Sequence, residues 1–352
     1  MSDKRYEANI IRATAVEPAN NLEVTSAPGV WSLDEVMELQ KKNKWPTVGN
    51  VTTDVTDVFS TFLYEGDGTP QSINNGVDLS GEGGLVWIKV RTDSGNHVLY
   101  DTERGATKGL YSNDTSGEVT RSGGLTSFNS NGFSVGNFFW ENGTTPSDDF
   151  VSWTFRKAAK FFDIVTYTGN NGTQTINHNL GSVPGMIIVK RLNDAGHWGV
   201  KHRSIPATKG MFLNQTAATY TNSTYWGDTE PTSTQFTVSL TNSVDSAPYV
   251  AYLFAHNDGD GEFGPGQDED IIKCGSFSHN FNGAEVNLGF EPQWILLKAK
   301  DQTNNWYIFD AMRGIVTGGL SGDGDAGLIA NSSNAENVTT WGVDLTSTGF
   351  IV

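Results

Sequence analysis

The sequence predicts a mainly β protein with three tandem lectin-like or jelly-roll β-sandwich repeats of about 100 residues each. A continuous apolar run rich in β-branched residues occurs three times, at residues 85–91, 186–191 and 294–300. Each run carries a lysine at the matching position, and these are Lys89, Lys190 and Lys298. Such a run favours a strand buried on both faces, because a half-buried strand would alternate apolar and polar residues. Forty glycines and only 18% charged residues also indicate a turn-rich β protein.

Two further landmarks recur around these runs. A late strand with a central Phe-x-Val or Phe-Ile-Val pattern occurs at residues 132–135, 235–238 and 349–352. An aspartate three residues before an Arg-Gly pair follows the first and third runs, as Asp101 with Arg104 and Asp310 with Arg313. A carboxylate and a guanidinium at this spacing predict a bidentate ion pair that braces the loop after a strand. Repeat 2 lacks this pair, so its role is predicted to be structural rather than catalytic.

The landmarks divide the chain into consecutive parts. Residues 1–54 form an arm with a short helix, followed by repeat 1 at 55–160 and repeat 2 at 161–258. An acidic, glycine-rich linker at 259–270 precedes repeat 3 at 271–352. The first junction has almost no spacer and is predicted to be rigid. The linker is predicted to be a flexible hinge, because glycine loosens the backbone and like charges extend it.

Repeat 3 ends on the late strand, without the strand that closes the other two repeats. Repeats 1 and 2 each continue to an apolar closing strand, at residues 150–155 and 249–254. A sandwich without this strand would expose a sheet edge and apolar surface. We therefore expect either that the chain is the N-terminal part of a longer fibre, which we favour, or that another chain supplies the strand.

The stretch after residue 30 predicts a short helix. Ser32 and Glu35 fit a capping box, and Pro46 ends the helix. A helix of about three turns is marginal alone in water, so its apolar side should dock on repeat 1 or on another subunit. The candidate attachment residues are Trp31, Leu33, Val36, Met37 and Trp45.

Charge and hydropathy exclude several classes of partner. The net charge is −17, which argues against nucleic acid or an anionic membrane surface as a ligand. No apolar run approaches the ~20 residues that cross a bilayer, so we expect no membrane insertion. The single cysteine, Cys274, excludes an intrachain disulfide framework and is expected to be a core residue.

The sequence offers little for metal or catalytic chemistry. Asp258, Asp260 and Glu262 alternate in the linker and form a weak calcium candidate, set against a solvated hinge. The histidines form no metal-binding motif. His97 and His197 are aligned with Trp306, which favours a packing position over a catalytic one. No nucleophile elbow, phosphate loop or dinucleotide fingerprint occurs, so we expect a non-enzymatic protein without a cofactor.

Aromatic residues in the late, polar part of each repeat are candidates for carbohydrate contact, because sugar faces stack on aromatic rings. An alternative is that these rings plug the ends of the sandwiches or the junctions between repeats. The candidates are Trp140, Tyr220, Tyr225, Trp226 and Trp341.

The threefold pattern of apolar strand with lysine, Trp or His, Asp–Arg–Gly and Gly–Phe–Val resembles a module of structural proteins in phages that infect marine bacteria. Residues 29–35 and 44–46 are similar to a segment of the same class of tail and fibre proteins. Repeat 2 departs from the pattern by lacking the Asp–Arg–Gly element. The resemblance carries over no catalytic residue.

The resemblance implies a virion protein that is made in the host cytoplasm. Its N-terminus would attach to other tail proteins, and its repeats would project toward the host surface, where they could bind a glycan. Tail fibres of this class imply a homotrimer. The alternatives are a capsid decoration or fibre protein and, from the enzyme class, a polysaccharide depolymerase.

Overall fold

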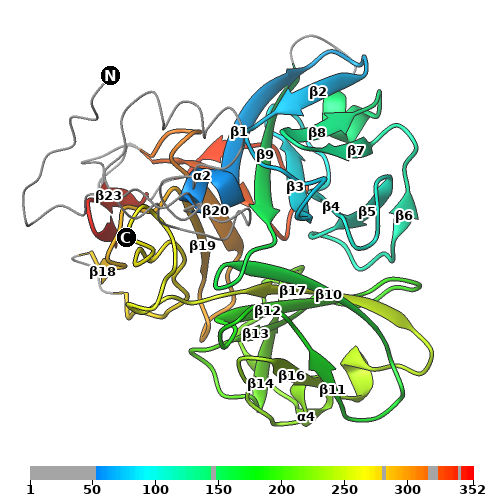
Figure 1. Ribbon diagram of the computed structural model, residues 1–352, viewed down its shortest axis with the longest axis vertical. Coiled ribbons are helices and arrows are strands. Elements are labelled where there is room, and N and C mark those ends of the chain that lie inside the picture. The colour runs from blue at the N-terminus through cyan, green and yellow to red at the C-terminus, as the bar shows by residue number, and fades with distance from the viewer. Residues whose placement is uncertain (1–52, 144–147, 280–282, 316–323, 340–341) are drawn as a thin grey trace, which may run out of the picture.

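The computed structural model describes residues 53–143, 148–279, 283–315, 324–339 and 342–352. Nearly all regular structure in these residues is antiparallel β-sheet, which confirms the mainly β prediction (Figure 1). The few helices are one turn long: α2 (Val55–Val58), α3 (Phe139–Asn142), α4 (Ser223–Trp226) and the 3₁₀ turn η1 (Leu240–Asn242). None of the helices in the described ranges is long and apolar enough to span a membrane.

Repeat 1 consists of a large sheet and a small one. The large sheet has the order β1-β9-β3-β4-β5-β6, and the small sheet has the order β2-β8-β7. The strands are β1 (Phe59–Gly66), β2 (Gln71–Asn74), β3 (Gly84–Val90), β4 (Val98–Asp101), β5 (Lys108–Tyr111), β6 (Val119–Thr120), β7 (Leu125–Asn129), β8 (Gly132–Val135) and β9 (Asp148–Arg156). The last strand in sequence, β9, therefore lies inside the large sheet, between the first strand and β3.

Repeat 2 has the same strand order. Its large sheet runs β10-β17-β12-β13-β14-β15, and β11 pairs with β16 in the small sheet. The strands are β10 (Phe162–Thr168), β11 (Gln174–Asn177), β12 (Met186–Arg191), β13 (Gly199–His202), β14 (Lys209–Phe212), β15 (Tyr220–Thr221), β16 (Gln235–Val238) and β17 (Pro248–Phe254). Here β17 occupies the place that β9 has in repeat 1.

In repeat 3 the described residues form the second part of the large sheet. Its strands are β18 (Glu285–Asn287), β19 (Trp294–Lys298), β20 (Trp306–Asp310), β21 (Ala326–Ile329), β22 (Asn337–Val338), β23 (Asp344–Thr346) and β24 (Gly349–Ile351). They form the sheets β19-β20-β21-β22 and β18-β24-β23. Among the described residues, no strand pairs with the outer edge of β19, where β9 and β17 lie in the other repeats.

The three large sheets share one central core. Alternate residues of β3 point to opposite sides: Leu85 and Trp87 reach the central core, while Val86 and Ile88 enter the core between the two sheets of repeat 1. The central core also takes side chains from β12, β17 and β20. Every residue of β3 is buried, as expected for a strand covered on both faces. The repeats are thus packed around a common centre rather than strung out as separate domains (Figure 1).

The linker at 259–270 is not the free hinge that its composition suggested. Phe263 is only 2% exposed, belongs to the central core and packs against Phe161. Glu262 forms an ion pair with Lys160 at 2.8 Å. A buried aromatic side chain and ion pairs to neighbouring segments fasten the linker to the body of the protein.

Candidate functional site

The predicted ion pairs after the first and third runs are present, and each joins two repeats. In repeat 1 the Arg104 guanidinium contacts the Asp101 carboxylate at 2.5 Å and donates to the backbone carbonyl of Leu99. Asp101 also accepts a hydrogen bond of 2.7 Å from the hydroxyl of Tyr252, which lies on β17 of repeat 2. Both charged side chains are almost completely buried. The pair therefore braces its own loop and anchors the closing strand of the next repeat.

The same arrangement links repeat 3 to repeat 1. Arg313 contacts Asp310 at 2.6 Å, and Asp310 accepts a hydrogen bond of 2.9 Å from the indole N–H of Trp153 on β9. Arg313 also pairs with Glu336, which binds Arg91 of repeat 1 at 2.8 Å. Because a buried ion pair needs further hydrogen bonds to offset desolvation, these partners explain how four charges are tolerated at the interface.

A second set of contacts follows the same circular order. The indole N–H of Trp198 in repeat 2 donates to the Tyr111 carbonyl of repeat 1 at 2.8 Å. The indole N–H of Trp306 in repeat 3 donates to the Phe212 carbonyl of repeat 2 at 2.9 Å. In repeat 1 the matching residue is His97, whose Nε2 is buried and has no hydrogen-bond partner among the described residues. The circle is closed by Ser112 of repeat 1, whose hydroxyl donates to the Ala330 carbonyl of repeat 3 at 2.6 Å.

This geometry corrects the predicted correspondence between histidines. The strand registers align His97 with Trp198 and Trp306, and His197 lies one position earlier on an exposed turn. Burial, with the positive charges of Lys89 and Arg313, lowers the pKa of His97 well below its usual range. The Trp87 indole donates to its Nδ1 at 2.9 Å. His97 is a neutral packing residue, as the predicted role requires, although the alignment behind that prediction was wrong.

Backbone hydrogen bonds complete each of the three interfaces. Gly196 donates to Thr115, Asn304 to Thr216 and Gly95 to Ser333, each at 2.8 Å. These bonds run from repeat 2 to 1, from 3 to 2 and from 1 to 3. The three repeats therefore close into a ring with approximate threefold symmetry.

Two of the three lysines that occupy the matching position in the repeats connect one repeat to the next. The ammonium of Lys190 donates to the carbonyls of Thr115 and Gly196, both at 2.8 Å, so it joins repeats 1 and 2. Lys298 does the same with Thr216 and Asn304 between repeats 2 and 3. Burial lowers the pKa of Lys190 to about 8. Lys190 and Lys298 therefore fasten neighbouring repeats together, whereas Lys89 donates to the carbonyls of Val90 and Asp93 within repeat 1.

A buried polar network inside repeat 1 was not found from the sequence. Glu141 is fully buried, accepts a hydrogen bond of 2.5 Å from Tyr100 and pairs with Arg121 at 3.1 Å. Burial raises the pKa of its carboxyl to about 7, although Arg121 and the hydrogen bonds oppose this shift. Arg121 lies over the rings of Trp140 and Phe138. The residues of this network are distant in sequence and have no fixed spacing, so no sequence motif predicted it.

Two of the five candidate carbohydrate contacts are core residues. Trp226 is 1% exposed and Tyr225 is 9% exposed, and both belong to the core of repeat 2. Tyr220 is stacked on Phe212 with 4.4 Å between ring centres. These rings have no free face for a sugar, which corrects the prediction for Tyr225 and Trp226. Trp140 is partly exposed and remains a candidate.

The acidic linker does not assemble a calcium site. Asp258 pairs with Lys273 at 3.1 Å, and Asp260 accepts a hydrogen bond from the backbone of Asp258. Glu262 faces Lys160 instead of the other two carboxylates. No group of three or more His, Cys, Asp or Glu side chains in the described ranges is placed to hold a metal ion.

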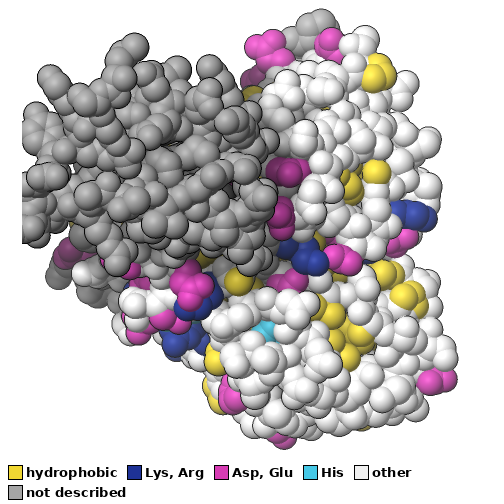
Figure 2. All heavy atoms as spheres, viewed as in Figure 1, with side chains coloured by type: hydrophobic (Ala, Val, Ile, Leu, Met, Phe, Trp, Pro, Cys, Tyr) yellow, Lys and Arg dark blue, Asp and Glu magenta, His cyan; other side chains and the backbone are white. Residues whose placement is uncertain are grey.

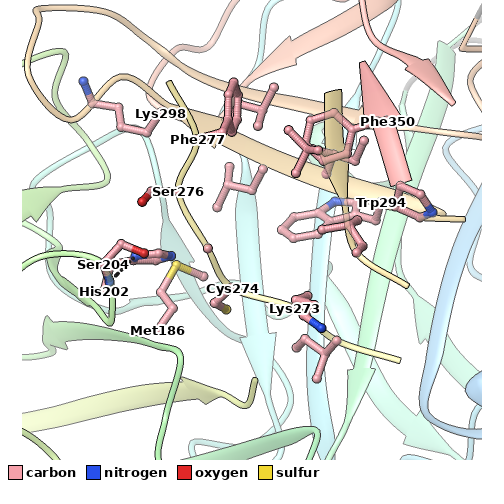
Figure 3. Close-up of a pocket in the computed structure, with 18 of the residues that line it drawn as sticks. Met186, His202, Ser204, Lys273, Cys274, Ser276, Phe277, Trp294, Lys298 and Phe350 are labelled. Carbon is pink, nitrogen blue, oxygen red and sulfur yellow. Dashed lines mark hydrogen bonds between the residues drawn. The ribbon is translucent and has the colours of Figure 1, made fainter. Parts of the chain in front are cut away.

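The described residues form a groove of about 1490 Å³ that is lined mainly by repeats 2 and 3. One wall is β19 with Trp294 and Lys298, and the other is the extended segment 272–278 (Figure 3). The floor includes Met186 and His202 of repeat 2. Burial, with the charges of Lys201 and Arg203, lowers the pKa of His202 to about 4, so the imidazole is neutral at pH 7.

The remaining predicted site residues lie outside the described part of the chain. These are the attachment residues Trp31, Leu33, Val36, Met37 and Trp45, and the aromatic residue Trp341. On the face drawn in Figure 2, acidic and basic side chains lie near the boundary between repeats 1 and 2, and hydrophobic side chains lie beside them on repeat 2. The charged clusters that the structure describes are thus engaged mainly in holding the repeats together.

Residues 54–352 match the model of a family described as a domain of unknown function, DUF7483, and the chain belongs to this family. No curated protein matches the chain. No solved structure matches it either.

Proposed function

We propose that this protein is a non-enzymatic structural component of a phage virion, most simply a tail fibre or tail appendage. In this proposal residues 1–54 attach to other tail proteins, and the three repeats project toward the host surface. The proposal begins from the resemblance of the repeat pattern to phage structural proteins. It also includes a homotrimer and a location in the virion tail.

The strongest support for the proposal is that the buried charged residues connect neighbouring repeats. Arg104 donates to the Tyr252 hydroxyl, Lys190 donates to the Thr115 carbonyl, and Arg313 lies over the Trp153 ring, so each of the three contacts a neighbouring repeat. Asp101 and Asp310 receive hydrogen bonds from the neighbouring repeat. An enzyme would direct such charged groups into a cleft, whereas here they hold the repeats rigidly together. A rigid β-sheet protein suits a component of a virus particle.

The direct test is to look for the protein in purified particles of the phage that encodes it. Mass spectrometry should detect the chain in intact particles, and immunogold labelling should place it on the tail. A chain lacking residues 1–50 should fold but should not be incorporated. Particles that never contain the full-length chain would contradict the proposal, and label on the head would move it to capsid decoration.

Host adhesion through a glycan is the finer part of the proposal, and Trp140 is a partly exposed aromatic candidate at which to test it. A glycan array probed with the full chain should give binding that Trp140→Ala weakens. The matched control is Trp198→Phe, whose ring is fully buried in the central core. Equal binding by the wild type and Trp140→Ala would remove Trp140 from the adhesion surface.

A further inference from the structure

The sheet of repeat 3 has a place that no described strand fills. In repeats 1 and 2 the lysine-bearing strand lies between two neighbours, with β9 or β17 on its outer side. β9 pairs in turn with β1, and β17 pairs with β10. In repeat 3, among the residues that the structure describes, β19 pairs only with β20. The matching place is the gap between β19 and the segment 272–278.

The groove described above is this place. Its two walls are the segment 272–278 and β19, the same elements that would flank a closing strand (Figure 3). Its floor is repeat 2, with Met186, His202, Ile205 and Met211. In the circular order of the ring, the closing strand of repeat 3 would cover repeat 2, just as β17 covers repeat 1 and β9 covers repeat 3.

Burial along the equivalent strands supports this reading. Every residue of β3 is buried, and so are five of the six residues of β12. In β19 only Ile295 is buried. Trp294 and Leu296 are the counterparts of Leu85 and Trp87, and both border the central core while remaining partly exposed. Apolar side chains that the other repeats cover are therefore open to the groove.

One polar atom in the groove also lacks a partner. The indole nitrogen of Trp294 is buried and has no hydrogen-bond acceptor within the described residues. A buried donor left without an acceptor costs free energy comparable to a lost hydrogen bond. A polypeptide in the groove would bring backbone carbonyls to this wall.

We propose that this groove binds an extended β-strand donated by a partner polypeptide. The donated strand runs antiparallel to β19 and to the segment 272–278, as β9 and β17 do in their own sheets. Strand addition at an open sheet edge gives affinity through main-chain hydrogen bonds and specificity through alternate side chains. Each strand in the described ranges already has a place in one of the sheets, so none of these strands is available as the donor.

Strands β9 and β17, which fill the equivalent places in repeats 1 and 2, indicate which side chains the donor carries. Alternate residues of β9 and β17 enter the central core, and they are Val151, Trp153 and Phe155, and Val250, Tyr252 and Phe254. The donor therefore has an aliphatic residue opposite Lys298 and aromatic residues opposite Leu296 and Trp294. The residues between them are Ser152 and Thr154 in β9 and Ala251 and Leu253 in β17, so small or aliphatic side chains fit beside Ile295 in the separate core of repeat 3.

The floor of the groove distinguishes this donor from β9 and β17. Trp153 and Tyr252 each donate to an aspartate, but His202 occupies the aspartate position in repeat 2. Its Nδ1 already accepts a hydrogen bond from the Ser204 backbone at 3.1 Å. Phenylalanine therefore fits the central position of the donor as well as tyrosine does.

The end of the groove adds a charge preference. Lys300 occupies the position of Arg91, which donates from its backbone to the Asp149 carbonyl of β9 and interacts with the Asp149 carboxylate. An acidic residue at the start of the donor would meet Lys300 in the same way, since opposite charges across a strand pair are favourable. The partner is thus an extended strand that begins with an acid and then places one aliphatic and two aromatic side chains in the central core.

The test uses a fluorescent peptide copied from residues 246–256, which include β17, and the full-length chain. Fluorescence anisotropy should show saturable binding, and a scrambled peptide of the same composition should not bind. Hydrogen exchange should slow at the amides of β19 and of the segment 272–278, and not at those of β3. This protection pattern locates the peptide in the groove.

Peptide variants keep the test independent of protein folding. Tyr252→Asp in the peptide should weaken binding at least about tenfold, because a charge would enter the central core. Ser246→Asp, outside the strand, is the matched control and should not weaken it. On the protein, Leu296→Asp should abolish binding, whereas Val338→Asp places the same charge on the opposite edge of the same sheet and should leave binding unchanged.

Four results would overturn the proposal. They are no saturable binding, equal binding of the scrambled peptide, binding that appears only after removal of residues 1–50, and self-association of the chain that competes with the peptide. The third result would assign the groove to the N-terminal segment of the chain itself. The fourth would assign it to a second copy.

Discussion

The hydroxyl of Tyr252 donates a hydrogen bond of 2.7 Å to the Asp101 carboxylate, across the interface between repeats 2 and 1. Trp153 makes the equivalent bond to Asp310, from repeat 1 to repeat 3. In both cases the closing strand of one repeat completes the ion pair of another. Neither pair can be fully satisfied within a single repeat, so the stability of each repeat depends on its neighbour.

Tyr252→Phe tests this dependence with the smallest change. The variant keeps the ring in the central core but removes the donor to Asp101, and it should lower the free energy of unfolding by about 1–2 kcal/mol. Urea denaturation would measure the loss. Tyr307→Phe is the control, because the Tyr307 hydroxyl donates to Asn304 at an exposed position, at 3.3 Å. Equal stability of Tyr252→Phe and wild type would show that the bond contributes nothing.

Arg313→Met should have a larger effect. The side chain of Arg313 is completely buried, and its removal leaves the Asp310 carboxylate without its cation. Breaking a buried pair from one side typically costs about 3–5 kcal/mol. Arg91→Met removes a partly exposed partner of Glu336 and should cost about 1 kcal/mol or less. Similar losses in the two variants, measured by urea denaturation, would refute the distinction.

Glu141 should make stability depend on pH. Burial raises the pKa of its carboxyl to about 7 in the folded protein, while the unfolded chain releases the same proton near pH ~4.3. Between these values the folded state binds more protons, so the contribution of Glu141 to stability falls as pH rises and is level above pH ~7. Below pH ~4.3 both states hold the proton.

Glu141→Gln removes this titration while keeping the shape of the side chain. Relative to wild type, the variant should gain stability by up to about 3 kcal/mol as pH rises from ~4.5 to ~7.5. The measurement is a series of urea denaturation curves across that range. A constant difference between the two proteins at every pH would mean that Glu141 titrates as an ordinary surface acid.

Local patterns in the sequence predicted the strands well. The runs at 85–91 and 186–191 are strands covered on both faces, because one face meets the central core and the other meets the small sheet. The Asp–Arg spacing also predicted its ion pairs, since three residues separate the partners within one loop. Both features depend on neighbours in sequence, so the sequence carries them directly.

The long-range features were not predictable in the same way. Composition made 259–270 look like a hinge, but Phe263 binds it to the core through contacts with distant segments. The sequence alignment of repeats 1 and 2 was shifted by one residue, so it matched His97 with His197 instead of Trp198. In a strand, a shift of one residue moves a side chain to the opposite face. Tyr225 and Trp226 looked like loop residues because their burial comes from the tertiary fold. The ring itself arises from pairings between repeats, which no single motif encodes.

The most direct test of the closed ring is small-angle X-ray scattering on a fragment that begins at residue 51. A compact body of this length should have a radius of gyration of about 20 Å. Three separate domains strung end to end, each with a radius of about 13 Å, would give roughly 26 Å or more. We predict the smaller value, with no change when Tyr252→Phe is introduced in the folded protein. A value near 26 Å would contradict the ring and restore the linear array.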